Sequence, residues 1–377
     1  MKFQVERDAL ADAVTWAARG LPNRPPVPVL AGVLVEADSD GTLTLSAFDY
    51  EVSARVSVPA DVSEPGRVLV SGRLLADIAR NLPGKPVDVV TEGTKVNLTC
   101  GATRFALLTM PVEEYPTLPS MPEASGHIGG DVFSQAVAQV TVAAGRDDTL
   151  PILTGVRLEI EGDKITLLAT DRYRLAQREL TWSPEATDAA GVALIPARTL
   201  SETARALGAT ASVELALGRS GAGDGLVGLE SGQRRTTSRL LDGEYPKVSS
   251  IFPSTSDTDA VVDTAVLTEA VKRVALVAER NTPVRLRFSD EQVVIEAGQG
   301  DDAQASEAIE AHLQGEEIEI AFNPHFLLDG LSVIGTPFAR LSFTQPSKPA
   351  VLRGQSELDG SADDSYRYVL MPVRLAG

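Results

Sequence analysis

Apolar residues recur every three or four positions in three stretches of similar length, at 6–20, 132–146 and 266–280. In the first stretch, Leu10, Ala13 and Ala17 fall at i, i+3 and i+7, which places them on one face of a helix. All three stretches carry a central Ala-Val pair and close on Ala-x-Arg. The pattern predicts one amphipathic helix in three copies, with Asp131 and Thr264 as N-caps of the second and third.

A second helix is predicted about fifty residues after each of these, following a short apolar strand. Its copies lie at 68–84, 193–208 and 320–335, and each closes at or near Gly, a residue favoured at helix C-termini. Alternating apolar residues then predict paired strands, and Glu92-Gly93 has the chemistry of a hairpin turn. The fold class expected is α+β, with two helices packed on antiparallel sheet in each copy.

These elements belong to one larger unit that the chain contains three times. Each copy runs from an Arg through a Pro-containing turn, an apolar strand, an acidic hairpin tip and a second strand. The anchors Arg24, Arg146 and Arg280 are about 122 and about 134 residues apart, far beyond the roughly 20–50 residues of a solenoid repeat. The repeats therefore predict three domains, which we place at 1–122, 128–253 and 257–377.

Composition narrows the class of protein. The chain has 377 residues, a formal net charge of −18, one cysteine and three histidines. The single Cys100 excludes an intramolecular disulfide framework, and the scarcity of Cys and His leaves little for a zinc site. No apolar run is long enough to span a membrane, and the N-terminus lacks the apolar core of a signal peptide. We expect a soluble cytoplasmic protein without a membrane partner.

Few residues have the spacing of a catalytic or cofactor site. Gly223, Gly225 and Gly228 match G-x-G-x-x-G, but the match lies between two predicted strands, with no helix to bind a pyrophosphate. We interpret it as a hairpin tip. Neighbouring acids form three pairs, Asp147-Asp148, Asp301-Asp302 and Asp363-Asp364, which we interpret as solvated loop charge rather than metal ligands. The histidines, at His127, His312 and His325, fit surface or capping roles, so we expect no enzyme activity, metal or cofactor.

The basic residues are organised differently. About a third of the Lys and Arg residues lie on or beside the six predicted helices, at matching points of the three repeats. The simpler alternative is a solvated helix surface with internal salt bridges. If the helices share one side, however, an acidic protein could present one basic surface to phosphates.

Four motifs then identify a family. ATDRYRLA at 169–176, GEYP at 243–246, AFNP at 321–324 and YVLMPVRL at 368–375 closely resemble those of bacterial DNA polymerase III beta subunits, the sliding clamps of the replicase. The style of the sequence is similar to clamps of high-GC Gram-positive bacteria. The resemblance implies a non-catalytic processivity factor that forms a head-to-tail homodimeric ring around double-stranded DNA. Such a ring contacts phosphates without reading sequence.

The resemblance also implies partners and sites. The replicative polymerase alpha subunit, the clamp loader delta subunit, other polymerases and repair proteins would bind through short peptides containing Gln, Leu and an aromatic residue. The implied DNA-binding residues are Arg24, Arg73, Arg80, Arg146, Arg198 and Arg205. The implied peptide pocket comprises Leu153, Thr170, Tyr173, Arg174, Leu175, Pro246, Ile251, Asn323, Phe326, Val369, Leu370, Met371, Pro372, Val373, Arg374 and Leu375. The implied dimer interface comprises Phe105, Leu107 and Leu276.

Two positions depart from the family pattern. Arg172-Tyr173 replaces the small residue and His common in other clamps, and Ser250 stands where a basic residue is frequent. An altered pocket leaves an alternative open, in which the chain is a clamp paralogue that confers resistance to a clamp-binding antibiotic.

Overall fold

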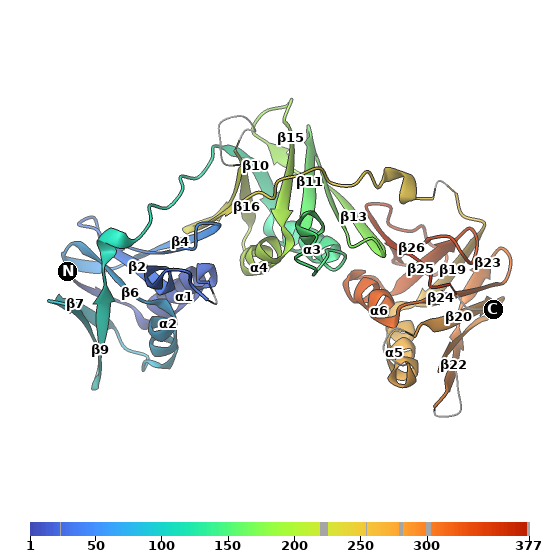
Figure 1. The fold of residues 1–377 in the computed structure, drawn as a ribbon, viewed down its shortest axis with the longest axis horizontal. Coiled ribbons are helices and arrows are strands. Elements are labelled where there is room, and N and C mark those ends of the chain that lie inside the picture. The colour runs from blue at the N-terminus through green and yellow to red at the C-terminus, as the bar shows by residue number, and fades with distance from the viewer. Residues whose placement is uncertain (23, 219–224, 254, 279–281, 299–302, 375–377) are drawn as a thin grey trace. The chain divides into compact units, whose positions relative to one another are not determined.

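The computed structural model describes residues 1–22, 24–218, 225–253, 255–278, 282–298 and 303–374 (Figure 1). The chain packs into two compact units. The first contains Met1–Ile128 and Thr210–Leu240, and the second contains Gly129–Ala209 and Leu241–Gly377. The division falls inside the central repeat because the last strands of that repeat continue the sheet of the first one. The three domain bounds inferred from the repeats therefore stay a prediction.

The predicted helices are present in three pairs. They are α1 (Arg7–Ala17) with α2 (Gly72–Asn81), α3 (Gly130–Thr141) with α4 (Ala197–Leu207), and α5 (Thr264–Val274) with α6 (Pro324–Val333). The two helices of each pair lie side by side (Figure 1). In α1, the predicted apolar residues Leu10, Ala13 and Ala17 are buried, which confirms the face assigned to them.

The predicted N-caps were misplaced. The N-cap of α5 is Asp263, whose carboxylate accepts a hydrogen bond from the Val266 N–H at 2.9 Å, and Thr264 is already inside the helix. The N-cap of α3 is Gly129, while Asp131 lies in the first turn. In both cases the chain enters the helix directly from a strand, so the helix begins earlier than its apolar periodicity indicates.

One antiparallel sheet runs through the first unit. Its strands are β1 (Lys2–Val5), β2 (Gly32–Ala37), β3 (Thr42–Phe48), β4 (Val52–Pro59), β5 (Asp61–Glu64), β6 (Gly66–Ser71), β7 (Val87–Glu92), β8 (Lys95–Cys100), β9 (Thr103–Met110), β10 (Ala124–Gly129), β16 (Ser212–Leu217), β17 (Leu226–Ser231) and β18 (Arg234–Arg239). Their order is β10-β16-β17-β18-β4-β3-β2-β6-β9-β8-β7-β1-β5. The hairpin at Glu92-Gly93 is confirmed, since Glu92 pairs with Lys95 and Gly93 has a φ of 60°.

The second unit contains two sheets. Its strands are β11 (Gly155–Glu161), β12 (Lys164–Thr170), β13 (Arg174–Thr181), β14 (Ser183–Pro184), β15 (Ala190–Pro196), β19 (Thr258–Asp263), β20 (Val284–Ser289), β21 (Gln292–Ala297), β22 (Ala305–Glu310), β23 (His312–Gln314), β24 (Ile318–Phe322), β25 (Phe338–Phe343), β26 (Ala350–Gln355) and β27 (Tyr366–Leu370). One sheet has the order β15-β11-β12-β13-β27-β26-β25-β19-β23, and the other has the order β22-β21-β20-β24; the short strand β14 belongs to neither.

Two strand pairings join successive repeats in the same register. In the first unit β4 pairs with β18, and Ala54 lies opposite Thr236. In the second unit β13 pairs with β27, and Ala176 lies opposite Tyr368. Since β4 and β13 are the fourth strands of their repeats, and β18 and β27 are the last, both pairings join equivalent strands.

Two buried tyrosines of β27 tie it to the helices of the second unit. The hydroxyl of Tyr366 donates to the carbonyl of Gln139 on α3 at 3.0 Å, and that of Tyr368 donates to the carbonyl of Phe326 on α6 at 2.8 Å. Burial raises the pKa of both phenols. Within the described part of the chain, no helix is long and apolar enough to cross a membrane.

Candidate functional site

The turn between β12 and β13 is the centre of the candidate site. One carboxylate oxygen of Asp171 accepts hydrogen bonds from the N–H groups of Tyr173 and Arg174, each at 3.0 Å. Arg172 between them has a φ of 79°, in the left-handed region that glycine adopts most easily. The turn therefore holds Tyr173 and Arg174 in fixed positions at some cost in backbone strain.

The first repeat contains the same turn. The carboxylate of Asp49 accepts from the N–H groups of Glu51 and Val52 at 2.9 and 2.7 Å, and Tyr50 has a φ of 75°. A tyrosine hydroxyl also binds the preceding strand in both copies. Tyr115 accepts from the Phe48 N–H at 2.8 Å, and Tyr245 accepts from the Thr170 N–H at 2.9 Å.

Arg174 is buried and connects the turn to α6 and β27. Its Nε lies 3.0 Å from Asp171, and its Nη1 lies 2.5 Å from Asp329 and 3.3 Å from the Tyr368 hydroxyl. The guanidinium also lies over the Phe326 ring, 4.4 Å from its centroid. Burial opposes the charged form, but Tyr368, Asp329 and Asp171 together raise the pKa of Arg174. The side chain is thus a fixed cation beneath the site.

A hollow of 690 Å³ opens beside this turn. Leu150 and Leu153 line it from the loop after α3, Tyr173 and Arg174 from the turn, and Phe326 from α6. The rings of Tyr173 and Phe326 stack, with centroids 6.2 Å apart and an interplanar angle of 24°. Tyr173 is 57% exposed, so its ring is available to a ligand. The hollow thus combines apolar and aromatic surface with a charged margin, which includes Arg146, Asp147 and Asp329, and such a site can bind a peptide side chain.

An apolar cluster lies next to the hollow along the β12–β13 hairpin. Its buried members are Leu175, Val248, Val351 and Val369, and Leu168, Ile251 and Phe252 pack against them. Val248, Ile251 and Phe252 come from the segment between Leu241 and Asp257, which we call the linker. Because the linker covers Leu175 and Val369, these two side chains are core residues in this conformation.

The last described residues follow the edge of the site. The N–H of Met371 donates to the carbonyl of Tyr173 at 2.9 Å, and the N–H of Val373 donates to the carbonyl of Ala321 at 2.8 Å. Asn323 is the N-cap of α6, and its side chain accepts from the His325 N–H at 2.9 Å. These bonds hold the C-terminal segment between the turn and β24.

The predicted pocket residues come from five separate stretches of sequence, and they do not form one cavity. Leu153, Tyr173, Arg174 and Phe326 line the hollow. Leu175 and Val369 are buried in the apolar cluster, and Ile251 packs against it. Thr170 and Leu370 are buried, Asn323, Met371 and Pro372 are half-buried, and Val373 and Arg374 are exposed. Pro246 lies in a separate groove described below, and Leu375 lies outside the described residues.

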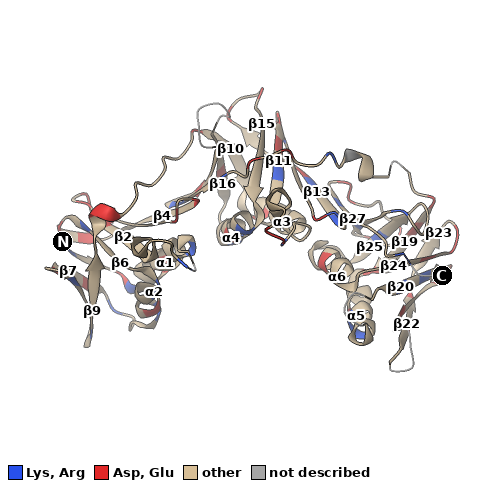
Figure 2. Cartoon of the chain, viewed as in Figure 1, with Lys and Arg blue, Asp and Glu red and all other residues tan. Residues whose placement is uncertain are grey.

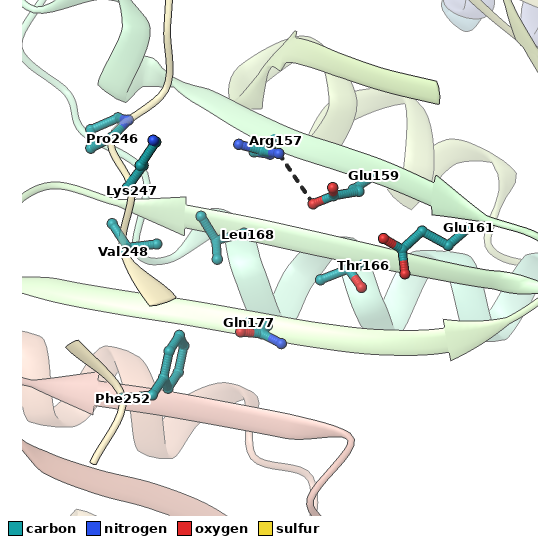
Figure 3. Close-up of a pocket in the computed structure, with 10 residues that line it drawn as sticks. All are labelled: Arg157, Glu159, Glu161, Thr166, Leu168, Gln177, Pro246, Lys247, Val248 and Phe252. Atoms are coloured by element: carbon teal, nitrogen blue, oxygen red, sulfur yellow. Dashed lines mark hydrogen bonds and ion pairs between the residues drawn. The ribbon is translucent and has the colours of Figure 1, made fainter. Parts of the chain in front are cut away.

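Sequence reasoning missed that groove, which has a volume of 440 Å³ (Figure 3). It lies on the sheet beyond the apolar cluster, between the linker and strands β11, β12 and β13. Leu168, Val248 and Phe252 form one end with Lys247, whereas Glu159 and Glu161 lie at the other. Its strand residues alternate with buried ones, a pattern typical of any exposed sheet face, so the sequence alone did not distinguish them.

All six predicted DNA-binding arginines are exposed. Arg73 and Arg80 lie on α2, and Arg198 and Arg205 lie on α4, where Figure 2 shows basic positions on the helices. The salt-bridge alternative applies to Arg80, which lies 2.6 Å from Asp77, and to Arg198, which lies 3.0 Å from Glu202. Such exposed pairs are weak and can exchange for phosphate.

Arg146, one of the six predicted DNA-binding residues, also lies beside the hollow. It borders the hollow that contains Leu153 and Tyr173, so the predicted DNA-binding residue also lies at the candidate peptide site. The third repeat anchor, Arg280, lies outside the described residues.

The predicted interface residues differ in exposure. Leu276 is 84% exposed and Phe105 is 38% exposed, but Leu107 is only 3% exposed. Because side chains alternate along a strand, Leu107 points into the core of its own domain, while the adjacent Leu108 is 68% exposed. Leu107 is therefore unsuited to a direct intersubunit contact in this conformation.

The remaining sequence candidates have local roles. Asp147 accepts hydrogen bonds from the Thr149 N–H and hydroxyl, which lower the pKa of its carboxyl. Asp363 and Asp364 pair with Arg178 and Arg353 at 3.2 and 2.5 Å. Asp301, Asp302 and Gly223 lie outside the described residues, and Gly228 lies within β17. In the part of the chain that the structure describes, no three His, Cys, Asp or Glu residues form a group that could hold a metal.

Comparison with known proteins decides the family. Models of the N-terminal, central and C-terminal domains of the DNA polymerase III beta subunit match residues 1–119, 127–247 and 249–374. The chain is 60% identical over 377 residues to the beta sliding clamp of Streptomyces coelicolor, covering 100% of both chains. The chain belongs to the beta sliding clamp family. This confirms the resemblance seen in the motifs, the three clamp domains and the assignment to DNA replication.

Two further comparisons place the chain within the sliding clamps. It is 48% identical over 374 residues to the beta sliding clamp homolog GriR of Streptomyces muensis, covering 99% of each. The higher identity to the S. coelicolor clamp favours the replicative function over the resistance paralogue. Clamp structures from Bacillus subtilis and from Pseudomonas aeruginosa, the latter bound to griselimycin, match with a TM-score of 0.91 at 27% and 29% identity, covering 100% of each chain.

Proposed function

We propose that two copies of this chain close head to tail into a ring around duplex DNA and tether the replicative polymerase and other partners to it. The clamp contributes processivity and no catalysis, and it works in the cytoplasm. Membership of the sliding clamp family supports the proposal, as do the three repeated domains, which we place at 1–122, 128–253 and 257–377.

The observation that best supports ring closure is the repeated strand pairing. The fourth strand of the first repeat, β4, pairs with the last strand of the second, β18, and β13 pairs likewise with β27. One equivalent pair remains, namely β22 of the third repeat and β9 of the first. β22 is an edge strand, and β9 meets β6 only through Thr109 and Met110. Exposed strand edges favour pairing with another chain, and a head-to-tail pair that closes gives a ring.

The repeats also specify the register of this pairing. Ala47, Ala169 and Ala297 occupy the same place on β3, β12 and β21, and their partners are Ala54, Ala176 and Ala305. Ala54 lies opposite Thr236, and Ala176 lies opposite Tyr368. The residue of β9 that corresponds to Thr236 and Tyr368 is Phe105. We therefore place Ala305 of one subunit opposite Phe105 of the other, and Ser306 opposite Arg104. Leu276 and Leu108 supply further exposed apolar surface, and Leu108 replaces Leu107 in the proposed interface.

A cysteine pair tests the register. Ser306 and Arg104 are both exposed, so we expect Ser306→Cys with Arg104→Cys to give a disulfide-linked dimer under mild oxidation. The matched control is Ser306→Cys with Phe105→Cys, because a shift of one residue turns the side chains to opposite faces. Cys100 is buried and should not compete. No cross-link in the first variant, or equal cross-linking in both, would contradict the register.

For DNA, we assign Arg24, Arg73, Arg80, Arg146, Arg198 and Arg205 to phosphate contacts inside the ring. All six are exposed, and four lie on helices of two repeats. A locally basic lining is compatible with the net charge of −18, because the acidic residues elsewhere on the surface limit non-specific binding.

For partners, we propose that short peptides of the polymerase alpha subunit, the clamp loader delta subunit, other polymerases and repair proteins bind at the hollow. Tyr173 and Phe326 offer aromatic surface there, and the C-terminal segment forms its edge. Deletion of residues 371–377 removes the Met371 and Val373 hydrogen bonds to the turn and to β24. We expect peptide binding to be lost while the dimer mass is unchanged; retained peptide affinity would show that the pocket is elsewhere.

A further inference from the structure

The groove beyond the apolar cluster has an arrangement that the proposed pocket does not use. Successive stretches of the β12–β13 hairpin line the hollow (Asp171 to Arg174), the apolar cluster (Leu175) and the groove (Leu168 and Gln177). Strands rise by about 3.3 Å per residue, so about five residues of extended chain would span the three. Because the linker covers the cluster, a partner segment seated at the hollow would have to pass over the linker to reach the groove, and about this length would suffice.

A row of neighbouring residues crosses the sheet at this point. Arg157 lies opposite Leu168, Leu168 opposite Gln177, and Gln177 opposite Arg367 on β27. Since directly opposite residues share a face, all four side chains lie on the side that the linker covers. Arg367 is two residues from Val369 of the cluster, which is about 7 Å along the strand. The row of Arg157, Leu168, Gln177 and Arg367, which has a basic residue at each end, thus borders the apolar cluster.

Two cations at this border are not neutralised by carboxylates. The Arg367 guanidinium lies over the Phe252 ring, 4.5 Å from its centroid, and no carboxylate of the described residues lies within ion-pair distance of it. Lys247 is exposed and likewise has no ion pair among the described residues. Arg157, by contrast, lies 3.2 Å from Glu159 and is partly neutralised.

The acidic end of the groove limits what can bind. Glu161 is exposed at the end farther from the linker, and Glu179 lies 2.8 Å from Lys164 and accepts from Gln177 at 3.0 Å. A long acidic segment would meet Glu159 and Glu161 and be repelled. One or two carboxylates near the linker would meet Lys247 and Arg367, beside an Arg157 that Glu159 already partly neutralises.

We propose that Lys247 and Arg367 bind an acidic flank, one or two Asp or Glu residues, of the partner peptide that occupies the hollow. The inference rests on the proposed peptide-binding function and adds a specificity determinant to it. The apolar cluster and Phe252 exclude water on one side, which strengthens the attraction, while Glu161 restricts the flank to a short one. Charges at such a margin select between partners more than they add affinity.

The test compares synthetic peptides that share the Gln, Leu and aromatic core and carry two Asp or two Asn residues at one end or the other. By fluorescence anisotropy at low salt, we expect one Asp peptide to bind roughly fivefold more tightly than its Asn counterpart. We expect Lys247→Gln and Arg367→Gln to remove that difference without changing Asn-peptide affinity. Arg287→Gln, which changes the same charge on β20, is the matched control and should leave the difference intact.

The outcomes separate the two claims. If Asn and Asp peptides bind equally at both ends, or if the preference survives in Lys247→Gln, the acidic-flank inference is wrong while the pocket stands. Lys247 is exposed, so its variant should fold even if Arg367→Gln does not. If no peptide binds the native chain, the proposed pocket is wrong and the inference fails with it.

Discussion

The hydroxyl of Tyr245 accepts a hydrogen bond from the backbone N–H of Thr170 at 2.9 Å. Tyr115 makes the same bond with Phe48 in the first repeat, at 2.8 Å. In both repeats the tyrosine belongs to the Glu-Tyr-Pro sequence of a junction, and its partner ends the strand before the left-handed turn. The bond therefore ties each junction to the adjacent hairpin, and in the second repeat this fixes the linker beside the pocket.

These tyrosines make stability sensitive to alkaline pH. Burial raises the pKa of Tyr115 from 10.0 to about 12 and raises the pKa of Tyr245 as well. A group whose pKa is raised on folding stabilises the folded state fully below its unfolded pKa and loses that contribution as the pH rises. We expect the urea midpoint to fall between about pH 10 and about pH 12, and to fall less in Tyr115→Phe. An identical pH dependence in the two proteins would contradict the assignment.

Arg172 stores backbone strain. Its φ of 79° costs a non-glycine residue about 1 kcal/mol, so Arg172→Gly should be neutral or stabilising by up to about 1 kcal/mol. Arg172→Val should be destabilising, because a β-branched residue fits this region worst. Thermal unfolding of the two variants checks the difference, with Tyr50→Gly as the equivalent change in the first repeat. Equal destabilisation by Gly and Val would show that the side chain, not the backbone, matters.

Arg174 is predicted to be indispensable to the site. Arg174→Met leaves Asp171, Asp329 and the Tyr368 hydroxyl without their shared cation and should cost about 3–5 kcal/mol. Asp329→Asn should cost less, since its side chain is 37% exposed. Urea unfolding of both single variants and the double variant gives the coupling energy, expected at about 1–3 kcal/mol. Additive effects would mean that the two groups do not interact.

The basic residues should govern the salt dependence of DNA contact. Arg24→Ala with Arg146→Ala should weaken binding and lower the slope of log K against log salt by about 2, since each phosphate contact contributes about 1. Arg287→Ala, an exposed arginine on β20, should change neither quantity. The dimer mass should be the same in all three proteins, and an unchanged slope in the double variant would remove both residues from the DNA surface.

Helices and hairpins were predictable because their signals are local. The Leu10 stripe and the Glu92-Gly93 turn depend only on neighbours within a few residues, and both are present. The motifs at 169–176 and 368–375 also contain residues that lie together at the candidate site. What each motif residue contacts there was not predictable, because Leu175 and Val369 are covered by a linker whose path depends on tertiary packing.

Side-chain positions that depend on the partner strand or element were not predictable from the sequence. Leu107 and Leu108 are adjacent and alike, and only the pairing of β9 with β8 decides which one faces the core. Asp263, not Thr264, is the N-cap of α5, since strand β19 runs directly into the helix. Arg367 lies against Phe252 of the linker only because β27 pairs with β13 and the linker crosses this part of the sheet.

The central claim is that a closed ring holds DNA topologically. The most direct measurement loads the protein on nicked circular DNA and follows its retention by gel filtration in high salt, before and after the circle is linearised. A ring should stay on the circle and leave the linear form, because salt weakens phosphate contacts but does not open a closed ring. Equal loss from both forms in high salt would show that ordinary electrostatic binding, not encirclement, holds the protein on DNA.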